Sequence, residues 1–404
     1  MSRLAGVDLQ PIYDSRGQPT VEATVVLSSG ARGIAGAPSG ASTGRHEPRA
    51  FPADGVPGAL RAFRERVRGK LLGVEGALAS VDAALREVDG TADLSTIGGN
   101  TATAISVATA LAIAEESHRP LWRVLARPGV EGTAFPAIVG NCLNGGRHAI
   151  GGPDIQEFHA IARGTTPDES VRAALRVHRL LGEALHAQHP SAPLGRGDEG
   201  GWVAGVGNVE AFGLLRDACD RARDELRIDV RPGLDLAASE FYRDGRYRYR
   251  EQTLDVEGQV RFVAEMVDRF GFVYIEDPLD QEAFEAFAQL TKAVAGKAKV
   301  VGDDLYVTNA RRLERGIALG SSDAILIKVN QAGTLTSTLE TVDLARRKGI
   351  ATVTSHRSGE LPEGWLAHVA LGTGAWGLKC GLLGGERVAK LNELLRLGRP
   401  AFQP

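Results

Sequence analysis

Residues 272–276 read Phe-Val-Tyr-Ile-Glu, residues 299–303 read Lys-Val-Val-Gly-Asp, and residues 324–328 read Ala-Ile-Leu-Ile-Lys. Each is a short apolar run that ends on a chargeable side chain, and such runs alternate with stretches of helical spacing. The pattern recurs along the chain and places one polar residue at or near the end of each run: Asp235, Glu276, Asp303, Lys328, His356 and Lys379. Their separations of 23 to 41 residues are close to the ~30 residues of one strand-helix-strand unit.

These run ends predict an α/β barrel enzyme. Polar ends of successive parallel strands converge only where the sheet closes or nearly closes, and in (β/α) barrels that edge carries the active site. A single acid after a strand is often only the N-cap of the next helix. Capping does not explain the set, because it does not call for Lys328, His356 and Lys379 at equivalent places.

The N-terminal part of the chain has a different pattern. Residues 20–27 and 31–37 predict a β-hairpin, and residues 58–89 and 101–126 carry apolar side chains at helical spacing. Residues 36–44 form a loop rich in Gly and Ser, which suits a mobile lid or a close approach to a ligand, or else a plain surface turn. We expect an α+β capping domain over residues 1–127 and a barrel domain over residues 128–404.

Composition excludes several other classes of protein. A chain of 404 residues is longer than one hydrophobic core usually supports, so we expect more than one domain. A content of 43% apolar residues and a net charge of −3 are typical of a globular protein and give no electrostatic preference for nucleic acid. No apolar run reaches membrane-spanning length and the N-terminus lacks a signal-peptide core, so we expect a cytoplasmic protein with no membrane partner. Cys142, Cys219 and Cys380 share no metal-ligand spacing and are expected to be plain thiols.

The run ends also predict a metal and a base. Asp235, Glu276 and Asp303 form an all-oxygen set, which favours Mg²⁺ or Mn²⁺ over zinc. Only eight of the 47 basic residues are Lys, yet Lys328 and Lys379 both stand at run ends. Arg stays protonated, whereas a buried Lys beside divalent cations can serve as a general base. We therefore expect one of these two lysines to accept a proton.

Loops between the runs supply further candidates. Residues 197–201, Gly-Asp-Glu-Gly-Gly, hold Glu199 between glycines as a candidate general acid, although such a sequence alone is also an ordinary turn. Residues 144–148 and 156–158 fit a loop with a satisfied histidine. Residues 356–358, His-Arg-Ser, offer a cation and a hydroxyl for a phosphate. Together these groups predict proton abstraction next to a carboxylate, followed by loss of a leaving group.

The chain resembles the enolase family from residue 14 to residue 392. The motifs that carry the resemblance are Asp-Ser-Arg-Gly-Gln-Pro-Thr-Val-Glu (14–22), Pro-Ser-Gly-Ala-Ser-Thr-Gly (38–44), Gly-Asp-Glu-Gly-Gly (197–201), Ile-Glu-Asp-Pro (275–278), Gly-Asp-Asp-Leu (302–305), Lys-Val-Asn-Gln (328–331) and Ser-His-Arg-Ser-Gly-Glu (355–360). The resemblance implies a small α+β cap followed by an enolase-type (β/α)8 TIM barrel whose first turns depart from regular βα order. It also implies a homodimer or higher homo-oligomer.

The resemblance further implies a lyase that dehydrates 2-phosphoglycerate or a close analogue to phosphoenolpyruvate or its analogue. Two Mg²⁺ ions would bind, the first to Asp235, Glu276 and Asp303 and the second, together with substrate, to Ser39. Lys328 would remove the C2 proton, and the metals with Lys379 would neutralise the charge that develops on the substrate carboxylate.

The remaining implied roles concern the leaving group and the phosphate. Glu199, with Glu157 and His356 beside it, would protonate the departing C3 hydroxyl. The phosphoryl group would be held by Arg357 and Ser358, with His148 closing over it.

Departures from the family pattern raise an alternative function. Residues 380–387 are one residue shorter than the family's Thr-Gly-Ala-Pro-x-Arg-Ser-Glu-Arg and lack its first Arg, Arg147 stands where Ser is common, and Arg45 adds a further cation. An added Arg near the phosphate end suits a substrate with one more carboxylate, which an Arg fork binds bidentately. The alternative is a carboxyphosphonoenolpyruvate synthase of phosphinate antibiotic biosynthesis, which dehydrates a phosphonoformyl ester of glycerate. A non-catalytic binding protein of this fold would require loss of metal or base residues, and none is lost.

Overall fold

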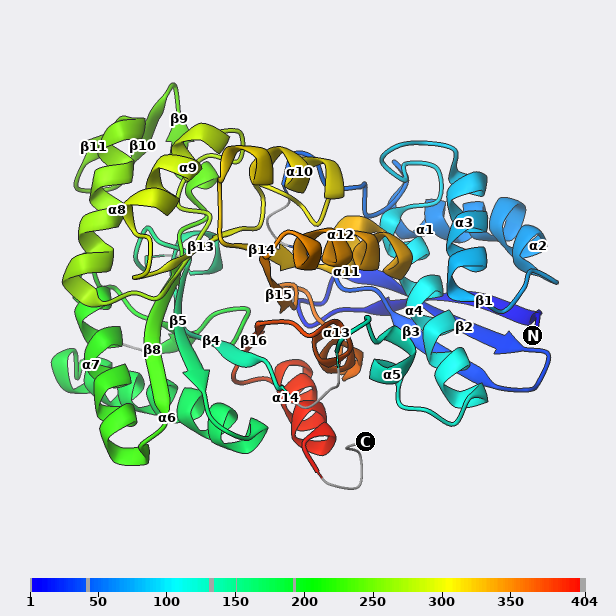
Figure 1. The fold of residues 1–404 in the computed structure, drawn as a ribbon, viewed down its shortest axis with the longest axis horizontal. Helices are drawn as coiled ribbons and strands as arrows, with labels where there is room; N and C mark the ends of the chain where they lie inside the picture. Colours follow the sequence, from blue (N-terminus) through cyan, green and yellow to red (C-terminus); the bar gives the residue numbers. More distant parts are fainter. Residues whose placement is uncertain (1, 41–43, 131–133, 150, 192–193, 400–404) are drawn as a thin grey trace.

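The computed structural model describes residues 2–40, 44–130, 134–149, 151–191 and 194–399, although not the side chain of His148. It consists of an N-terminal α+β cap, on the right in Figure 1, and a C-terminal barrel, on the left and at the centre. The last helix of the cap is α5 (Leu121–Leu125), and the first strand of the barrel is β4 (Ala137–Asn144).

The sheet of the cap is antiparallel, in the order β1-β2-β3. The predicted hairpin is confirmed as β2 (Pro19–Leu27) and β3 (Arg32–Gly36). Strand β1 (Leu4–Tyr13) was not predicted, because a register shift between Leu4 and Gly6 breaks the alternation of buried and exposed side chains.

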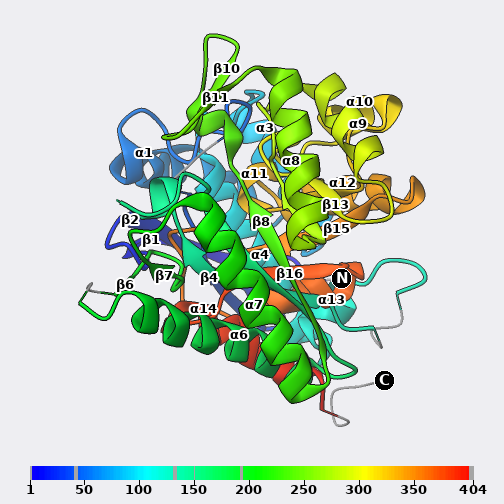
Figure 2. The ribbon, with the colours of Figure 1, turned by 90° about the vertical axis from the view of Figure 1, so that its left-hand side faces the viewer.

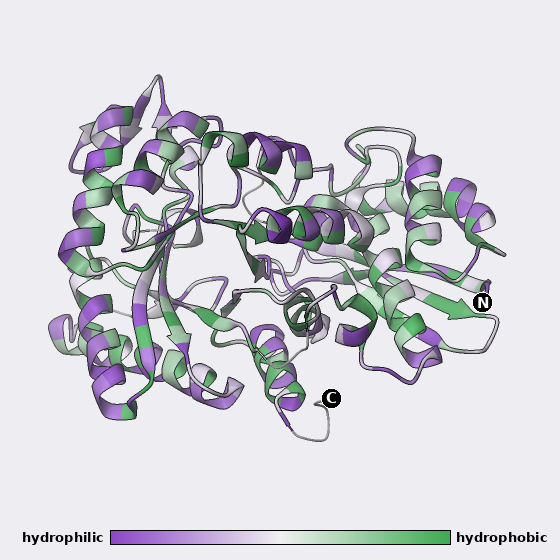
Figure 3. Cartoon of the chain, viewed as in Figure 1, coloured by the Kyte–Doolittle hydropathy of each residue, from purple (hydrophilic) through white to green (hydrophobic). Residues whose placement is uncertain are grey.

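Helices pack against this sheet. They are α1 (Gly55–Ala62), α2 (Arg68–Leu71), α3 (Leu78–Asp89) and α4 (Gly99–Glu116), with a π-helical turn at Phe63–Val67. Helix α4 is buried on almost every side, and its ribbon is white to green over most of its length in Figure 3, unlike that of the outer helix α2. At Gly33 a Cβ would lie 1.9 Å from the carbonyl oxygen of Ala108, so only glycine lets β3 pass this close to α4.

Within the described residues, eight strands close the barrel through a pairing of the last strand with the first. After β4 they are β5 (Glu157–Arg163), β8 (Asp229–Asp235), β12 (Tyr274–Glu276), β13 (Lys299–Gly302), β14 (Ala324–Ile327), β15 (Ala351–Ser355) and β16 (Gly377–Gly381). Strand β5 runs antiparallel to both β4 and β8, while the later pairings are parallel. The predicted departure from regular βα order is therefore confirmed at β5.

The outer layer of the barrel is helical. Its helices are α6 (Pro167–Gln188), α7 (Asn208–Leu226), α8 (Val256–Phe270), α9 (Phe284–Ala293), α10 (Ala310–Leu319), α12 (Leu335–Arg347), α13 (Trp365–Thr373) and α14 (Gly385–Leu397). The short helix α11 (Val329–Ala332) follows β14 and packs against α4 of the cap. Figure 2 shows α6, α7 and α8 on the face opposite the cap. No helix in the described part of the chain is long and apolar enough to cross a bilayer.

Short extra strands accompany the barrel. They are β6 (Gly195–Arg196) and β7 (Trp202–Val203), which extend the sheet at β4, and a separate antiparallel sheet of β9 (Tyr242–Arg243), β10 (Arg246–Arg248) and β11 (Thr253–Leu254). The three cysteines are buried free thiols, as the sequence predicts.

The Ser39 end of the glycine-rich loop is fastened to the barrel at the end of β15. Ser39 and Gly359 exchange two backbone hydrogen bonds of 2.8 Å, and the amide of Ser15 donates to the carbonyl oxygen of Glu360 at 2.9 Å. The fold thus brings the start of this loop to the edge of the barrel where the polar run ends lie.

Candidate active site

Three carboxylates lie side by side at the open end of the barrel. In the strand register Glu157 on β5 is the direct partner of Asp235 on β8, and Asp235 is the direct partner of Glu276 on β12. Side chains of directly paired residues project from the same face of a sheet. These three therefore project together into the barrel mouth, and all are buried.

Lys379 reaches these carboxylates from β16. Its Nζ lies 2.9 Å from Oδ2 of Asp235, 2.8 Å from Oε1 of Glu276 and 3.5 Å from Oε1 of Glu157. Burial alone would lower the pKa of Lys379, but these carboxylates raise it well above its usual value. Lys379 is therefore a permanent cation, suited to neutralising charge rather than to accepting a proton.

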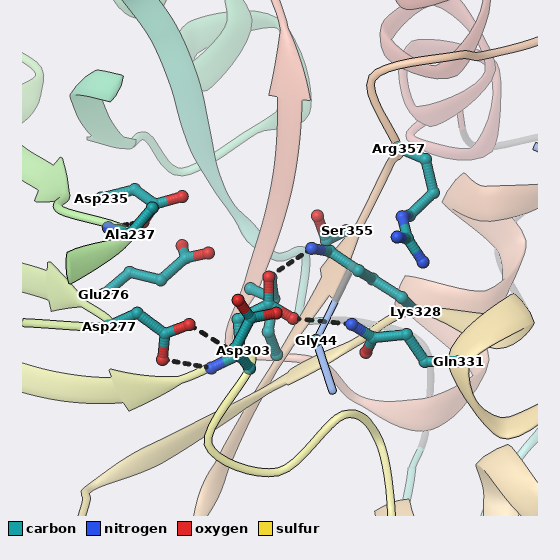
Figure 4. Close-up of polar contacts among 12 residues, drawn as sticks. Gly44, Asp235, Ala237, Glu276, Asp277, Asp303, Lys328, Gln331, Ser355 and Arg357 are labelled. Carbon is teal, nitrogen blue, oxygen red and sulfur yellow. Dashed lines mark hydrogen bonds and ion pairs between the residues drawn. The ribbon is translucent and has the colours of Figure 1, made fainter. Parts of the chain in front are cut away.

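Asp303 and Lys328 form a second group beside the first. Lys328, which follows β14, makes an ion pair with Oδ2 of Asp303, and Gln331 Nε2 donates to Oδ1 at 3.0 Å. Figure 4 shows Lys328 and Gln331 approaching Asp303 from one side, with Asp235 and Glu276 on the other. Burial alone would lower the pKa of Lys328, but Asp303 raises it. The ion pair with Asp303 favours the protonated form of Lys328, so Lys328 can accept a proton when Asp303 binds a different cation instead.

The predicted metal ligands are Asp235, Glu276 and Asp303, but the tightest acidic cluster among the described residues shares only Asp303 with them. That cluster is Asp277, Asp303 and Asp304, whose oxygens lie within 4.8 Å of one another. In this arrangement Lys379 contacts Asp235 and Glu276, whereas Lys328 is paired with Asp303.

Asp277 already has a structural role. Its Oδ1 accepts the amide of Asp303 at 2.9 Å and its Oδ2 accepts the amide of Asp304 at 2.7 Å, so both oxygens fix the loop after β13. Asp235, Glu276 and Asp303 each have instead one oxygen in contact with a lysine, and such an oxygen could also contact a metal.

The donor set fits Mg²⁺. Burial and then the neighbouring Asp235 raise the pKa of Glu276 well above its usual value, although Lys379 is in contact with both. One lysine therefore does not compensate the charge of these buried carboxylates. Hard oxygen ligands with uncompensated negative charge are suited to a divalent cation such as Mg²⁺.

The candidate acid Glu199 lies in a network with fixed proton positions. Nη1 of Arg387 lies 2.8 Å from Nδ1 of His356, and because the guanidinium can only donate, Nδ1 must be the unprotonated nitrogen. His356 Nε2 then donates to Oε2 of Glu199 at 3.1 Å. Burial lowers the pKa of His356 to about 4, which keeps the ring neutral. His356 therefore positions Glu199.

Asn141 connects Glu157 to Glu199 by hydrogen bonds. Its Nδ2 donates to Oε2 of Glu157 at 3.2 Å and to Oε2 of Glu199 at 3.1 Å. One amide group thus joins the carboxylate group on β5 to the candidate acid in the 197–201 loop.

The predicted phosphate ligands occupy the rim next to the cap. The guanidinium of Arg357 contacts both oxygens of Glu47, at 3.1 to 3.2 Å, and donates to Oδ1 of Asn330 at 2.9 Å. The carbonyl oxygen of Ser358 accepts from Arg387 at 2.5 Å. Ser39 lines an adjoining cavity of about 620 Å³ together with Arg357, and its Oγ accepts from Asn100 at 3.0 Å.

A narrow polar cavity collects most of the predicted site. It is lined by Gly40, Gln156, Glu157, Asp235, Asp303, Lys328, Ser355, His356, Arg357, Ser358 and Lys379. The side chain of His148 and residues 41–43 of the loop lie outside the described residues.

Arg147 does not join this cavity. Its Nε lies 2.6 Å from Oε2 of Glu240, and more than half of its side chain is exposed. The structure therefore gives no support to the expectation that Arg147 binds substrate. Arg45 is likewise directed toward an acid, with its Nη2 3.8 Å from Oδ2 of Asp280.

Sequence reasoning missed the polar residues that support the site. Asn141, Glu47 and Arg387 each contact a predicted site residue. Arg387 is fully buried in the segment that follows Lys379, and the one sequence signal for it was its place at the end of the altered 380–387 segment. A buried Arg needs several acceptors, and the nearby site supplies them.

Comparisons with known proteins agree with this geometry. Residues 4–125 match the family model described as the enolase N-terminal domain, and residues 133–400 match the enolase C-terminal TIM barrel domain. An enolase of Methanothermobacter thermautotrophicus is 43% identical over 98% of this chain and 96% of its own length. An enolase of Halorubrum lacusprofundi is 43% identical over 99% and 100%, and one of Picrophilus torridus is 38% identical over 96% and 97%.

Proposed function

Because this chain belongs to the enolase family, we propose that it is a Mg²⁺-dependent lyase that converts 2-phosphoglycerate to phosphoenolpyruvate and water. The observation that carries this proposal is the polar cavity, where Lys328, Lys379 and His356 line the same small space as the carboxylates of Asp235 and Asp303. A base, a permanent cation and a metal-binding oxygen set are what removal of a proton next to a carboxylate requires.

The base and the acid act from two sides of the site. Lys328 Nζ takes the proton from C2, and the electron pair of that C–H bond moves onto the substrate carboxylate to give an enediolate. When that pair returns to form the C2–C3 double bond, the C3–O bond breaks. Glu199, aligned by His356 and Asn141, gives its proton to the leaving hydroxyl, which departs as water. Lys379 lies against the charge that develops on the substrate carboxylate. Mg²⁺, held by Asp235, Glu276 and Asp303, would supply Lewis-acid stabilisation of the same charge.

The remaining assignments are parts of the same proposal. Ser39 would help to hold a second Mg²⁺ together with substrate, and Arg357, Ser358 and His148 hold the phosphoryl group. Arg357 then exchanges part of its contact with Glu47 for the phosphate. The active form is a cytoplasmic homo-oligomer, and the boundary between cap and barrel falls between residues 127 and 128.

The alternative substrate of phosphinate antibiotic biosynthesis is not favoured. The curated relatives that match over the full chain are enolases. The added cations that suggested a larger anionic substrate contact acids of this chain, Arg147 on Glu240 and Arg45 on Asp280. A non-catalytic role is not favoured either, because Lys328 and two of the metal-binding carboxylates, Asp235 and Asp303, line one cavity.

The experiment that tests the proposal is a direct assay of metal-depleted protein. The protein is treated with chelator, freed of it, and mixed with 2-phosphoglycerate with and without added Mg²⁺. We expect phosphoenolpyruvate to form only when Mg²⁺ is returned. No product from folded, Mg²⁺-loaded protein would refute the proposal.

A further inference from the structure

Two buried polar rings lie directly beneath the carboxylates of the site. Nε2 of His159 lies 2.8 Å from Oε2 of Glu157, and the hydroxyl of Tyr274 donates to Oε2 of Glu276 at 2.6 Å. His159 and Tyr274 both have 0% exposure, and their ring centroids are 5.7 Å apart in an edge-to-face arrangement. They are therefore one contact layer rather than two separate core residues.

The register of the strands places this layer one step below the site. Glu157, Asp235 and Glu276 are partners across β5, β8 and β12, and two residues lower His159, Gly233 and Tyr274 are partners across the same strands. A Cβ at Gly233 would lie 2.9 Å from Cβ of Tyr274. Because residue 233 is a glycine, β8 carries no side chain between the rings of His159 and Tyr274.

The proton on His159 is fixed by its surroundings. Within the described residues Nδ1 has no hydrogen-bond partner, whereas Nε2 faces a carboxylate oxygen. A proton on Nδ1 would leave a buried donor unpaired and would set two lone pairs against each other across 2.8 Å. Burial lowers the pKa of His159 to about 3, so the ring is neutral and its single proton lies on Nε2. His159 is therefore a donor to Glu157.

The two donors fix which oxygen of each glutamate faces the cavity. His159 and Asn141 both bond Oε2 of Glu157, so its Oε1 is the oxygen that faces Lys379. Tyr274 takes Oε2 of Glu276, and its Oε1 is likewise the oxygen in contact with Lys379. Each glutamate thus presents one defined oxygen to the cation that occupies the centre of the site.

We propose that His159 and Tyr274 form a donor layer that positions the site, with His159 orienting Glu157 for proton transfer through the Asn141–Glu199 connection and Tyr274 orienting Glu276 for Mg²⁺. The part that concerns proton transfer rests on the proposed dehydratase function. The part that concerns Mg²⁺ does not, because metal affinity is measured without substrate. Residues that orient metal ligands from behind typically contribute 10- to 100-fold to metal affinity or activity.

The test of Tyr274 is Mg²⁺ binding by titration calorimetry with metal-depleted Tyr274→Phe, which loses only the hydroxyl. We expect its affinity to fall about 10-fold. The matched control is Tyr306→Phe, which removes another buried hydroxyl, hydrogen-bonded to Ser322 at 2.8 Å, on the outside of the barrel. Wild-type affinity in Tyr274→Phe, or an equal loss in Tyr306→Phe, would overturn the role of Tyr274.

The test of His159 compares His159→Leu, which removes the donor, with His159→Gln, whose amide can still donate toward Glu157. We expect His159→Leu to lower kcat about 10- to 100-fold with KM changed less than about 3-fold, and His159→Gln to recover most of the loss. Equal losses in the two folded variants, or a change confined to KM, would overturn the role of His159. An inactive wild-type protein would refute the dehydratase proposal instead and would leave the Mg²⁺ result standing.

Discussion

His356 donates the proton on Nε2 to Oε2 of Glu199 across 3.1 Å, and Arg387 fixes this direction by occupying Nδ1. The histidine of the 356–358 motif is therefore a support for the acid rather than the acid itself. The division of labour matters for interpretation, because loss of activity in a His356 variant would report the orientation of Glu199.

Replacing Glu199 by Gln removes the proposed acid and keeps the shape of the side chain. We expect turnover to fall at least ~100-fold, as is typical when a general acid is lost. Asp198→Asn is the matched control in the same loop, because Asp198 is partly exposed and pairs with Arg16 at the surface. Near-normal turnover in Glu199→Gln, measured as phosphoenolpyruvate formation, would contradict the assignment.

The two buried lysines are expected to differ in function. Lys379 is surrounded by carboxylates, while Lys328 depends on Asp303 alone among the site's acids for its ion pair. We expect Lys328→Ala to lower turnover at least ~100-fold, through loss of the base. The control is Lys348→Ala, at the exposed end of α12. If steady-state rates show Lys328→Ala within a few-fold of wild type, the base lies elsewhere.

Arg147 is expected to be dispensable. Because it pairs with Glu240 at a half-exposed position, Arg147→Ser should change kcat/KM for 2-phosphoglycerate by no more than about 3-fold. A large gain in kcat/KM for this substrate would instead revive a specificity role for Arg147.

Stability should fall in mild acid because of buried neutral histidines. Burial lowers the pKa of His178 to about 4, and its Nε2 lies 2.9 Å from the carbonyl oxygen of Gly200. Below about pH 6.5 the unfolded chain binds a proton that the folded chain does not bind until about pH 4. Stability present above pH 6.5 is therefore lost across this window, by up to about 1.4 kcal/mol per pH unit for each such histidine.

The measurement is the melting temperature of His178→Gln at several pH values. We expect a shallower decline between pH 6.5 and 4 than in wild type, whereas His186→Gln, at an exposed position of the same helix, should retain the wild-type slope. Parallel curves for His178→Gln and wild type would refute this account.

The sequence predicted much of this molecule because its polar residues stand where buried strands end. Asp235, Glu276 and Lys379 stand at or near the ends of apolar runs, and a set of polar side chains at the ends of parallel strands is typical of the active-site edge of a barrel. The closed barrel was predicted from apolar runs that alternate with helical stretches, and the hairpin of the cap from two β-rich runs. Strand β1 was not predicted, because its register is irregular.

The supporting residues were not predictable in the same way. His159 and Tyr274 lie within apolar runs, where a ring reads as core, and only the register places them beneath Glu157 and Glu276. The contact of Arg147 was not predictable either, since a charge in a loop does not reveal its partner, which here is Glu240, more than 90 residues away in the sequence. Strand order and side-chain direction are properties of the folded chain.

The most direct test of the central claim follows the C2 hydrogen of 2-phosphoglycerate by nuclear magnetic resonance in D₂O with Mg²⁺ present. The account predicts that wild type forms phosphoenolpyruvate, that Glu199→Gln still exchanges the C2 hydrogen for deuterium while forming little product, and that Lys328→Ala does neither. Continued exchange by Lys328→Ala, or exchange abolished by Glu199→Gln alone, would contradict the assignment of base and acid to the two sides of the site.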